Sequence, residues 1–417
     1  MNSTLNGWRF QVARLAAATV ALIAGGGAAA DWPQFHGPRR DNVSDETGLL
    51  KQWPAGGPAL LWTATGIGEG FSSVAVADCQ VYVAGNVGGD TVLTALGLDG
   101  KIRWTAKNGP ADKHQYPGTR STPTVDGDRV YHEGADGDLA CLAAKTGKLR
   151  WSLNILAQFG GRSPRWGLSE SPLVDGDRLI CVPGGEKASM AALNKLTGET
   201  LWVCSDPNGK PGYGSPVAFD YGGVRQIVTM MDKSVVGVRA DTGKLLWRMP
   251  HEAAYDETTA TPLFHDRYVF VSTMTPTATQ CFELSAEGQE IGVKQAWQSA
   301  ALDNHHGGVV LLDGHLYGSA MNGKWVCLEA RGGGLVYRAE GVGKGSVTYA
   351  DGMFYTVAES GGTVGLAKAT PAGFAVVSRF RLPKGGNGPF WAHPAVSGGR
   401  LYLRHGDRLY CYDIKGK

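Results

Sequence analysis

The sequence has 417 residues, of which 61 are Gly, 40 are Lys or Arg and 38 are Asp or Glu. Hydrophobic residues make up 43% of it, which is typical of a globular protein and too high for a disordered chain. The formal net charge of +2 argues against nucleic-acid binding, which usually needs a basic excess, and against purely electrostatic attachment to an anionic membrane. The many glycines lack the every-third-residue period of collagen and predict numerous tight turns between short strands.

Residues 1–30 are predicted to be a secretory signal peptide. Arg9 and Arg14 provide positive charge, residues 15–23 form an apolar run, and three alanines at the end supply the small residues of a cleavage site. An uncleaved anchor is the alternative, but the run is shorter than the roughly 20 residues that a spanning helix needs. No Cys follows before Cys79, so the sequence does not predict a lipid anchor. We therefore expect a periplasmic or secreted protein with no transmembrane segment after cleavage.

One sequence pattern recurs down the chain, in which an apolar strand leads to Thr-Gly-Lys or a variant and then to Trp. The clearest copies are LTALGLDGKIRW at Leu93–Trp104, LACLAAKTGKLRW at Leu139–Trp151, MAALNKLTGETLW at Met190–Trp202 and VVGVRADTGKLLW at Val235–Trp247. Weaker copies begin at Gln280, Val326, Val364 and Tyr410. The closing aromatic residues are 40–51 residues apart, at Trp62, Trp104, Trp151, Trp202, Trp247, Trp297, Tyr337 and Phe380. This is the repeat length of four-stranded propeller blades.

Each repeat opens with a second pattern, in which alternating apolar residues flank Asp-Gly or a similar tight turn. STPTVDGDRVY from Ser121 and ESPLVDGDRLI from Glu170 are examples. Apolar alternation around Asp-Gly is a strong hairpin signal. Each unit therefore reads as strand, tight turn, strand, loop, strand, Thr-Gly-Lys turn and strand.

The two ends of the chain complement each other. Residues 58–64 resemble an unpaired fourth strand, whereas the last repeat, residues 392–417, contains three strands. Pairing them would close a ring and remove its exposed edges. We therefore predict an all-β fold, a single β-propeller of about eight four-stranded blades over residues 58–417, with an N/C-terminal seam and a lead-in arm at residues 31–57. Seven blades are the alternative, if one weak copy is not a blade.

The repeat also explains most Trp and Cys residues in structural terms. A Trp at the end of each outer strand is expected to dock on the neighbouring blade. One strand position accepts Ala, Gly or Cys and nothing larger, and its cysteines are Cys141, Cys281, Cys327 and Cys411. We expect these four to be buried thiols without disulfides, because facing blades lie about 10 Å apart and a disulfide needs Cα atoms within about 7 Å. Cys79, Cys181 and Cys204 suggest no pairing.

The Thr-Gly-Lys-x-x-Trp repeat resembles that of the pyrroloquinoline-quinone (PQQ) propellers, over essentially the whole mature chain. That family includes quinoprotein alcohol dehydrogenases and the outer-membrane assembly lipoprotein that shares their fold. The segments DWPQFHGPRRDNVSDETGLLKQWPAGGPALLW, from Asp31, and RWGLSESPLVDGDRLICVPGG, from Arg165, are similar to an extracytoplasmic subgroup. The resemblance implies the fold strongly and the activity weakly.

A site is expected where the loops that enter the innermost strands meet at one mouth of the central channel. Most of these loop residues are small, and the larger ones could converge on a ligand. We therefore predict a ligand-binding rim formed by Arg120, Trp166, Glu170, Tyr213, His305, His306, Lys344, Trp391 and His393. Glu170 could instead pair with Arg120 or Lys344 between blades, or act as a metal ligand or general base. Trp166 could pack on the opening, and His305 and His306 could simply hydrogen-bond within their loop.

A quinone-dependent dehydrogenase would need a stacked cofactor, Ca²⁺ with about 6–8 oxygen ligands, and a carboxylate base. The resemblance implies an adjacent Cys-Cys pair in larger members, which this sequence lacks; its rim offers Glu170, with Asp303 and Asn304 nearby. We therefore expect an exported, non-catalytic propeller that binds a ligand or protein partner, with no catalytic residue, metal or cofactor. The alternative is a PQQ-dependent alcohol dehydrogenase with its site in the central funnel, where PQQ and Ca²⁺ would bind near Trp391. A hydrolase would need a nucleophile–base pair or metal cluster, which the sequence pattern does not reveal.

Overall fold

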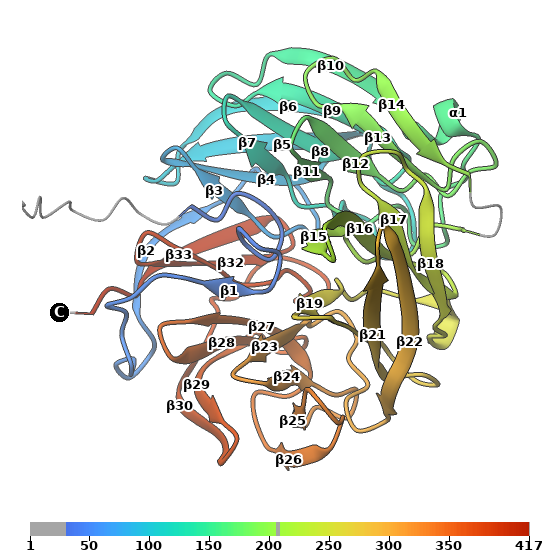
Figure 1. Ribbon diagram of the computed structural model, residues 1–417. Helices are drawn as coiled ribbons and strands as arrows, with labels where there is room; N and C mark the ends of the chain where they lie inside the picture. Colours follow the sequence, from blue (N-terminus) through green and yellow to red (C-terminus); the bar gives the residue numbers. More distant parts are fainter. Residues whose placement is uncertain (1–30, 206–208, 417) are drawn as a thin grey trace, which may run out of the picture.

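The structure is a computed structural model that describes residues 31–205 and 209–416. Within these ranges the chain forms eight β-sheets round a common axis (Figure 1), with one short helix, α1 (Ile155–Phe159), and one 3-10 turn, η1 (Ala254–Asp256). The predicted all-β, eight-bladed propeller is therefore confirmed. The predicted signal peptide, residues 1–30, lies outside the described residues. No helix among those described is long and apolar enough to span a membrane.

The first four blades follow one another in chain order, and the first strand of each lies nearest the axis. Blade 1 contains β3 (Ala75–Ala77), β4 (Gln80–Val87), β5 (Asp90–Gly97) and β6 (Ile102–Pro110). Blade 2 contains β7 (Thr124–Asp126), β8 (Arg129–Glu133), β9 (Asp138–Ala143) and β10 (Leu149–Asn154). Blade 3 contains β11 (Leu173–Asp175), β12 (Arg178–Cys181), β13 (Met190–Asn194) and β14 (Thr200–Cys204). Blade 4 contains β15 (Val217–Tyr221), β16 (Val224–Met231), β17 (Ser234–Arg239) and β18 (Leu245–Pro250).

The last four blades complete the ring. Blade 5 contains β19 (Leu263–His265), β20 (Tyr268–Ser272), β21 (Thr279–Glu287) and β22 (Glu290–Ser299). Blade 6 contains β23 (Val309–Leu312), β24 (His315–Ser319), β25 (Trp325–Glu329) and β26 (Leu335–Ala339). Blade 7 contains β27 (Gly345–Ala350), β28 (Met353–Ala358), β29 (Thr363–Thr370) and β30 (Gly373–Arg381), with β1 (Val43–Ser44) added at its inner edge. Blade 8 contains β31 (Ala395–Ser397), β32 (Arg400–His405), β33 (Arg408–Asp413) and β2 (Ala59–Ala64).

The terminal seam forms as predicted. Strand β2 is the outer strand of blade 8 and pairs antiparallel with β33, with Ala59 opposite Asp413 and Trp62 opposite Cys411. In Figure 1 the blue strand therefore lies beside the red one. One blade is thus built from both ends of the described chain, which closes the ring without a free sheet edge at the junction.

The lead-in arm, residues 31–57, enters the axis of the ring instead of lying outside it. The backbone of Trp32 exchanges two hydrogen bonds with Val76 of blade 1. Strand β1 then pairs in parallel with β27 of blade 7. Beyond it, the carboxylate of Glu46 accepts backbone N–H groups of blade 8. The arm therefore bonds to blades 1, 7 and 8, which are consecutive in the closed ring.

Arg40 anchors the arm at the axis. Its guanidinium donates to the backbone carbonyls of Ser171 (2.9 Å), Pro172 and Pro216 (3.0 Å), which lead into blades 3 and 4. Its side chain is 2% exposed, and burial lowers the pKa of the guanidinium to about 9, while the charge of Glu170 opposes that shift. A single buried cation therefore satisfies carbonyls from two blades that would otherwise lack partners at the centre.

Closing tryptophans join successive blades. In five blades the indole lies against a turn glycine of the next blade, where a methyl group would come within 2.5–2.9 Å of the ring, and its nitrogen donates to a carbonyl of that turn. The pairs are Trp62 with Gly100 and Leu98 O (2.8 Å), Trp104 with Gly147 and Ala144 O (2.9 Å), Trp151 with Gly198 and Lys195 O (3.1 Å), Trp202 with Gly243 and Ala240 O (2.9 Å), and Trp297 with Gly333 and Ala330 O (3.0 Å). The predicted docking is confirmed for these five.

Three junctions differ, those after blades 4, 6 and 7. After blade 6 the closing residue is Tyr337, which packs against a cluster that includes Val347 and Phe354 of blade 7. Blade 5 has no Thr-Gly-Lys turn because β21 and β22 continue as one long hairpin. The indole nitrogen of Trp247 accordingly donates to Gln226 Oε1 of its own blade at 2.9 Å, while its ring packs in a cluster that includes Val269 and Phe282 of blade 5. At the seam, Phe380 of blade 7 packs on Gly57, where a methyl group would lie 2.6 Å from the ring. The end of the arm thus supplies the turn glycine that blade 8 lacks.

The cysteine prediction is also confirmed. Cys141, Cys281, Cys327 and Cys411 are buried thiols without disulfides. They occupy the third strand of their blades, at the position that the repeat restricts to small residues. Of the three cysteines that suggested no pairing, Cys181 and Cys204 are buried and Cys79 is exposed.

Gly198→Ala is expected to destabilise the protein more than Gly314→Ala. Both glycines have positive φ, +78° and +74°, so an alanine at either position meets a similar backbone penalty of about 1–2 kcal/mol. A methyl group at position 198 would also lie 2.9 Å from the Trp151 ring, whereas nothing lies within 4 Å at position 314. We expect the free energy of unfolding, measured in urea, to fall about 1–3 kcal/mol further for Gly198→Ala. Equal effects would argue against the tryptophan contact as the source of inter-blade stability.

Arg40→Met is expected to lower the free energy of unfolding by on the order of 3 kcal/mol, because several buried carbonyls lose their donor. Arg39→Met is the matched control. The Arg39 side chain is 47% exposed and pairs with Asp41 and Asp45 at the surface, so its loss should cost less than about 1 kcal/mol. Urea unfolding of both variants measures the difference. Similar small losses would show that the arm is not anchored through Arg40.

Candidate functional site

The loops that enter the inner strands converge at one mouth of the ring around a pocket of about 590 Å³. The aromatic residues that line it are Phe35, Phe71, Tyr116, Trp166, Tyr213, Tyr255 and Trp391. The polar and charged residues are Gln115, Arg120, Arg165, Ser169, Glu257, Thr259, His305, His306, Glu359 and His393. Phe35 comes from the arm, which fills the axis, so the pocket has a floor and is not an open channel.

The structure brings most of the predicted rim residues to this pocket. The seven that line it are Arg120, Trp166, Tyr213, His305, His306, Trp391 and His393. Lys344 stands next to the lining, with Nζ 2.7 Å from Glu359 Oε2. Glu170 does not line the pocket. Glu170 occupies a loop position equivalent to that of the other predicted rim residues, but its side chain points between the blades and away from the pocket.

Glu170 is 4% exposed and lies beside the completely buried Glu133 of blade 2. Its Oε1 accepts a hydrogen bond from the backbone N–H of Val182 at 2.6 Å. Burial raises the pKa of both carboxyl groups, and the charge of Glu170 raises that of Glu133 further. The predicted placement on the rim is therefore wrong. So is the predicted pairing with Arg120 or Lys344, because those cations have other carboxylate partners.

Arg120 connects two of the loops through hydrogen bonds. Its Nη1 donates to Asp112 Oδ2 at 3.1 Å and to the Trp166 carbonyl at 2.9 Å. Its Nη2 donates to the carbonyls of Gln115 and Tyr116 at 3.0 and 2.9 Å. These four bonds occupy the guanidinium within the protein. Burial lowers its pKa, and Asp112 counteracts that shift. Arg120 thus holds two loops in register and has little capacity left to bind an anion.

One wall of the pocket is aromatic, and Trp391 is at its centre. The ring centroid of Trp391 lies 4.9 Å from that of Phe71 and 5.0 Å from that of Tyr116. The ring centroids of Tyr116 and Trp166 lie 6.4 Å apart. The guanidinium of Arg165 lies over the Trp166 ring, 4.7 Å from its centroid. Rings from blades far apart in sequence therefore form one continuous apolar surface that can stack on a planar group.

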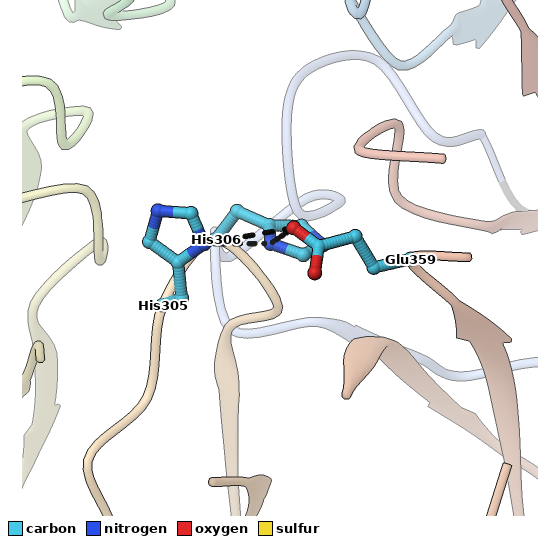
Figure 2. A group of neighbouring side chains, drawn as sticks. All are labelled: His305, His306 and Glu359. Carbon is cyan, nitrogen blue, oxygen red and sulfur yellow. Dashed lines mark hydrogen bonds and ion pairs between the residues drawn. The ribbon is translucent and has the colours of Figure 1, made fainter. Parts of the chain in front are cut away.

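The adjoining wall contains the adjacent His305 and His306 and the carboxylate of Glu359 (Figure 2). The two Nδ1 atoms lie 3.3 Å apart, and each lies 3.7–3.8 Å from Glu359 Oε1. The indole nitrogen of Trp391 donates to that oxygen at 2.7 Å. The polar wall is therefore tied directly to the aromatic wall. Lys344, at 2.7 Å from the other oxygen, balances the carboxylate charge.

Two histidines behind this wall are held neutral. Burial lowers the pKa of His393 to about 4, and its Nε2 donates to the carbonyl of His306 at 2.7 Å. Burial, with the nearby charges of His393 and Arg40, also lowers the pKa of His36, which stacks on Phe35 at 3.7 Å. The floor of the pocket is consequently uncharged, because imidazolium ions there would be poorly solvated.

The site also contains residues that were not predicted from the sequence, among them Glu257, Glu359, Phe35, Phe71 and Tyr116. Glu257 immediately precedes the aligned loop residues of blade 5, so extending that alignment by one residue would have found it. Glu359 follows β28, in the loop between the second and third strands of blade 7. In an antiparallel blade this loop lies at the same mouth as the loop entering the first strand, which is a usable signal. No sequence signal would have found Phe35, because only the tertiary structure places the arm at the axis.

Comparison with known proteins agrees with this architecture. A family model described as "Outer membrane protein assembly factor BamB" matches residues 42–165 and 162–318. Among curated protein sequences, none is significantly similar to this chain.

Several solved structures share the fold. BamB from Moraxella catarrhalis is 14% identical, with a TM-score of 0.61, and the match covers 86% of this chain and 98% of that one. A quinohemoprotein alcohol dehydrogenase from Comamonas testosteroni is 14% identical, with a TM-score of 0.62, covering 93% and 81%. A europium-containing methanol dehydrogenase is 11% identical, with a TM-score of 0.51, covering 90% of each chain. At these identities the similarity establishes the fold alone.

Glu170→Gln is expected to reduce the pH dependence of stability. The buried Glu133–Glu170 pair retains a proton that the unfolded glutamates release near their ordinary pKa of 4.5. Above that pH the folded protein binds more protons than the unfolded chain, so the free energy of unfolding falls as the pH rises. Thermal unfolding of wild type and variant between about pH 5 and pH 8 measures this slope.

Glu290→Gln is the control, since the Glu290 side chain is 78% exposed and should not alter the slope. The expected result is a shallower decline for Glu170→Gln alone. Parallel curves for all three proteins would contradict the shared proton.

Proposed function

Because this chain belongs to the PQQ-repeat propeller family described as outer membrane protein assembly factor BamB, we propose that it is an exported binding protein without chemistry of its own. Its ligand is a small, ring-containing and largely uncharged molecule, which binds in the floored pocket at the mouth of the ring. Export is supported by the composition of residues 1–30 and by the family description.

The observation that carries this proposal is the pairing of an aromatic wall with a polar wall in one floored pocket. Its volume of about 590 Å³ falls within the range typical of small-molecule sites. Trp391, Phe71 and Tyr116 supply a stacking surface, and His305 and Glu359 supply hydrogen-bonding groups beside it. A ring with polar substituents on one edge satisfies both walls.

The charges near the pocket support a ligand with little net charge. Arg120 is bonded to Asp112 and three carbonyls, and Lys344 is paired with Glu359. Arg165 lies over Trp166 at the exposed side and can accept one anionic substituent. A ligand with several carboxylates would need more cations than this arrangement offers.

The residues present do not fit calcium-bound PQQ. Ca²⁺ takes about 6–8 oxygen ligands, whereas the carboxylates that line the pocket are Glu257 and Glu359. Glu257 already accepts from His305 at 3.2 Å, and Glu359 accepts from Trp391 and Lys344. This donor set favours the binding role over the dehydrogenase alternative.

The proposal is tested with 1-anilinonaphthalene-8-sulfonate, a ring probe with a single anionic group. We expect one probe to bind per chain with micromolar affinity, quenching tryptophan fluorescence, and Trp391→Ala to weaken binding by about tenfold or more, or about 1.4 kcal/mol. The control is Leu149→Ala, since Leu149 is half-exposed on the outer strand of blade 2. Titration with PQQ and Ca²⁺, followed by a dye-linked alcohol oxidation assay, is run on the same samples.

Stoichiometric probe binding that depends on Trp391 and leaves Leu149→Ala unaffected supports the proposal. Alcohol turnover with PQQ and Ca²⁺ would replace it with the dehydrogenase alternative. Probe binding that is equal in both variants would place the probe elsewhere and shift the search to protein partners.

A further inference from the structure

We infer that His305, His306 and Glu359 form a binding site for a divalent transition-metal ion of the Zn²⁺ class, with an open coordination position facing the pocket. This inference rests on the geometry of three side chains and is independent of the organic ligand proposed above. Among the residues that the structure describes, this is the one group of three His, Cys, Asp or Glu side chains close enough to share an ion.

The first argument is the spacing of the donor atoms (Figure 2). The two Nδ1 atoms are 3.3 Å apart, and Glu359 Oε1 lies 3.7 Å from that of His306 and 3.8 Å from that of His305. Ligands bound tetrahedrally to Zn²⁺ at about 2.0–2.1 Å lie about 3.3–3.4 Å from one another. Small side-chain rotations, without backbone movement, would complete a three-ligand face around one ion.

The second argument is the support behind the donor atoms. His305 Nε2 lies 3.2 Å from Glu257 Oε2, so this nitrogen carries the proton and Nδ1 keeps a lone pair that a metal ion can use. A carboxylate on the far nitrogen of a ligating histidine is the usual support in protein zinc sites. Trp391 fixes Glu359 in the same way, since its indole N–H donates to Oε1 at 2.7 Å and leaves that oxygen a second lone pair.

The third argument concerns the kind of ion. Two imidazole nitrogens and one carboxylate oxygen suit Zn²⁺ and related transition metals, whereas Ca²⁺ and Mg²⁺ prefer oxygen ligands throughout. All three side chains line the pocket, so an ion can reach them from solvent. A metal with three protein ligands keeps a position for water or for a donor atom of a bound molecule.

Lys344 is the built-in competitor of the ion. Its Nζ lies 3.3 Å from His305 Nδ1 and 2.7 Å from Glu359 Oε2. Its charge opposes a cation, and its contact with Nδ1 occupies the lone pair that a metal would use. The side chain is 19% exposed and unbranched, so it can keep Oε2 and release Nδ1. Replacing it should therefore strengthen metal binding, which a purely structural ion pair does not predict.

The test is titration of the metal-free mature protein with Co²⁺, followed by Zn²⁺ competition. Visible absorption reports the coordination of Co²⁺, and quenching of tryptophan fluorescence reports its approach to Trp391. We expect one ion per chain, a loss of affinity of at least about 100-fold for Glu359→Gln and His306→Ala, and a loss of about 10–100-fold for Glu257→Gln, which removes the support behind His305. Lys344→Met is expected to bind more tightly than wild type.

Glu340→Gln and His265→Ala are the matched controls, because both side chains are mostly exposed and neither lines the pocket. The gain in Lys344→Met keeps the test decisive even if Glu359→Gln or His306→Ala fails to fold. The inference is overturned if wild type and Lys344→Met both fail to bind Co²⁺ and Zn²⁺ at micromolar concentrations, or if binding is the same in Glu359→Gln and Glu340→Gln. Neither result bears on the ring probe, which is measured without metal.

Discussion

The contact between a tryptophan of one blade and a turn glycine of the next is the interaction on which the ring depends. Each indole covers a surface that any side chain would block, and its N–H satisfies a turn carbonyl that the sheet leaves unpaired. Because the contact recurs from blade to blade, each sheet is oriented by its neighbour. Because blade 5 lacks the turn, Trp247 bonds to Gln226 of its own blade instead. At the seam, Gly57 of the arm provides the glycine on which Phe380 packs.

A rigid ring alone would leave a hole at its centre, and the arm fills it. Its backbone pairs with inner strands, and Arg40 bonds to carbonyls that no strand can reach. Placing a guanidinium there costs solvation, as the lowered pKa reflects, but several buried carbonyls gain a donor. The same arm brings Phe35 to the mouth. The arm therefore both closes the central channel and forms the bottom of the pocket.

The mouth shows how charge is distributed in such a ring. Some charged side chains, such as Arg120 and Asp112, bond to each other and hold the loops in place. Glu359 instead contacts Trp391 of the aromatic wall, the two histidines and Lys344. Deeper in the ring, burial raises the pKa of Glu133 and Glu170 and lowers that of His393. These groups are tolerated there because the shifts favour their uncharged forms, which need less solvation by water. The groups that can still change partners lie at the pocket, where we place the proposed binding site.

The sequence by itself determined the four-stranded blades, the seam, the tryptophan docking at five junctions and the small cysteine positions, and it left the choice between seven and eight blades open. All of these follow from a repeat whose spacing and turn residues are local, so no distant contact is needed to recognise them. Seven of the predicted rim residues also line one pocket, because loops at equivalent repeat positions meet at one mouth.

Only the tertiary structure decided the direction of Glu170, the convergence of Glu257 and Glu359 on His305, and the path of the arm. Two neighbouring residues of one loop can point to the pocket or between blades, and the packing of Glu133 and Val182 settles which. The arm pairs with β27, about 300 residues away, through backbone hydrogen bonds that no side-chain pattern encodes. Long-range packing, and not local propensity, therefore made the pocket.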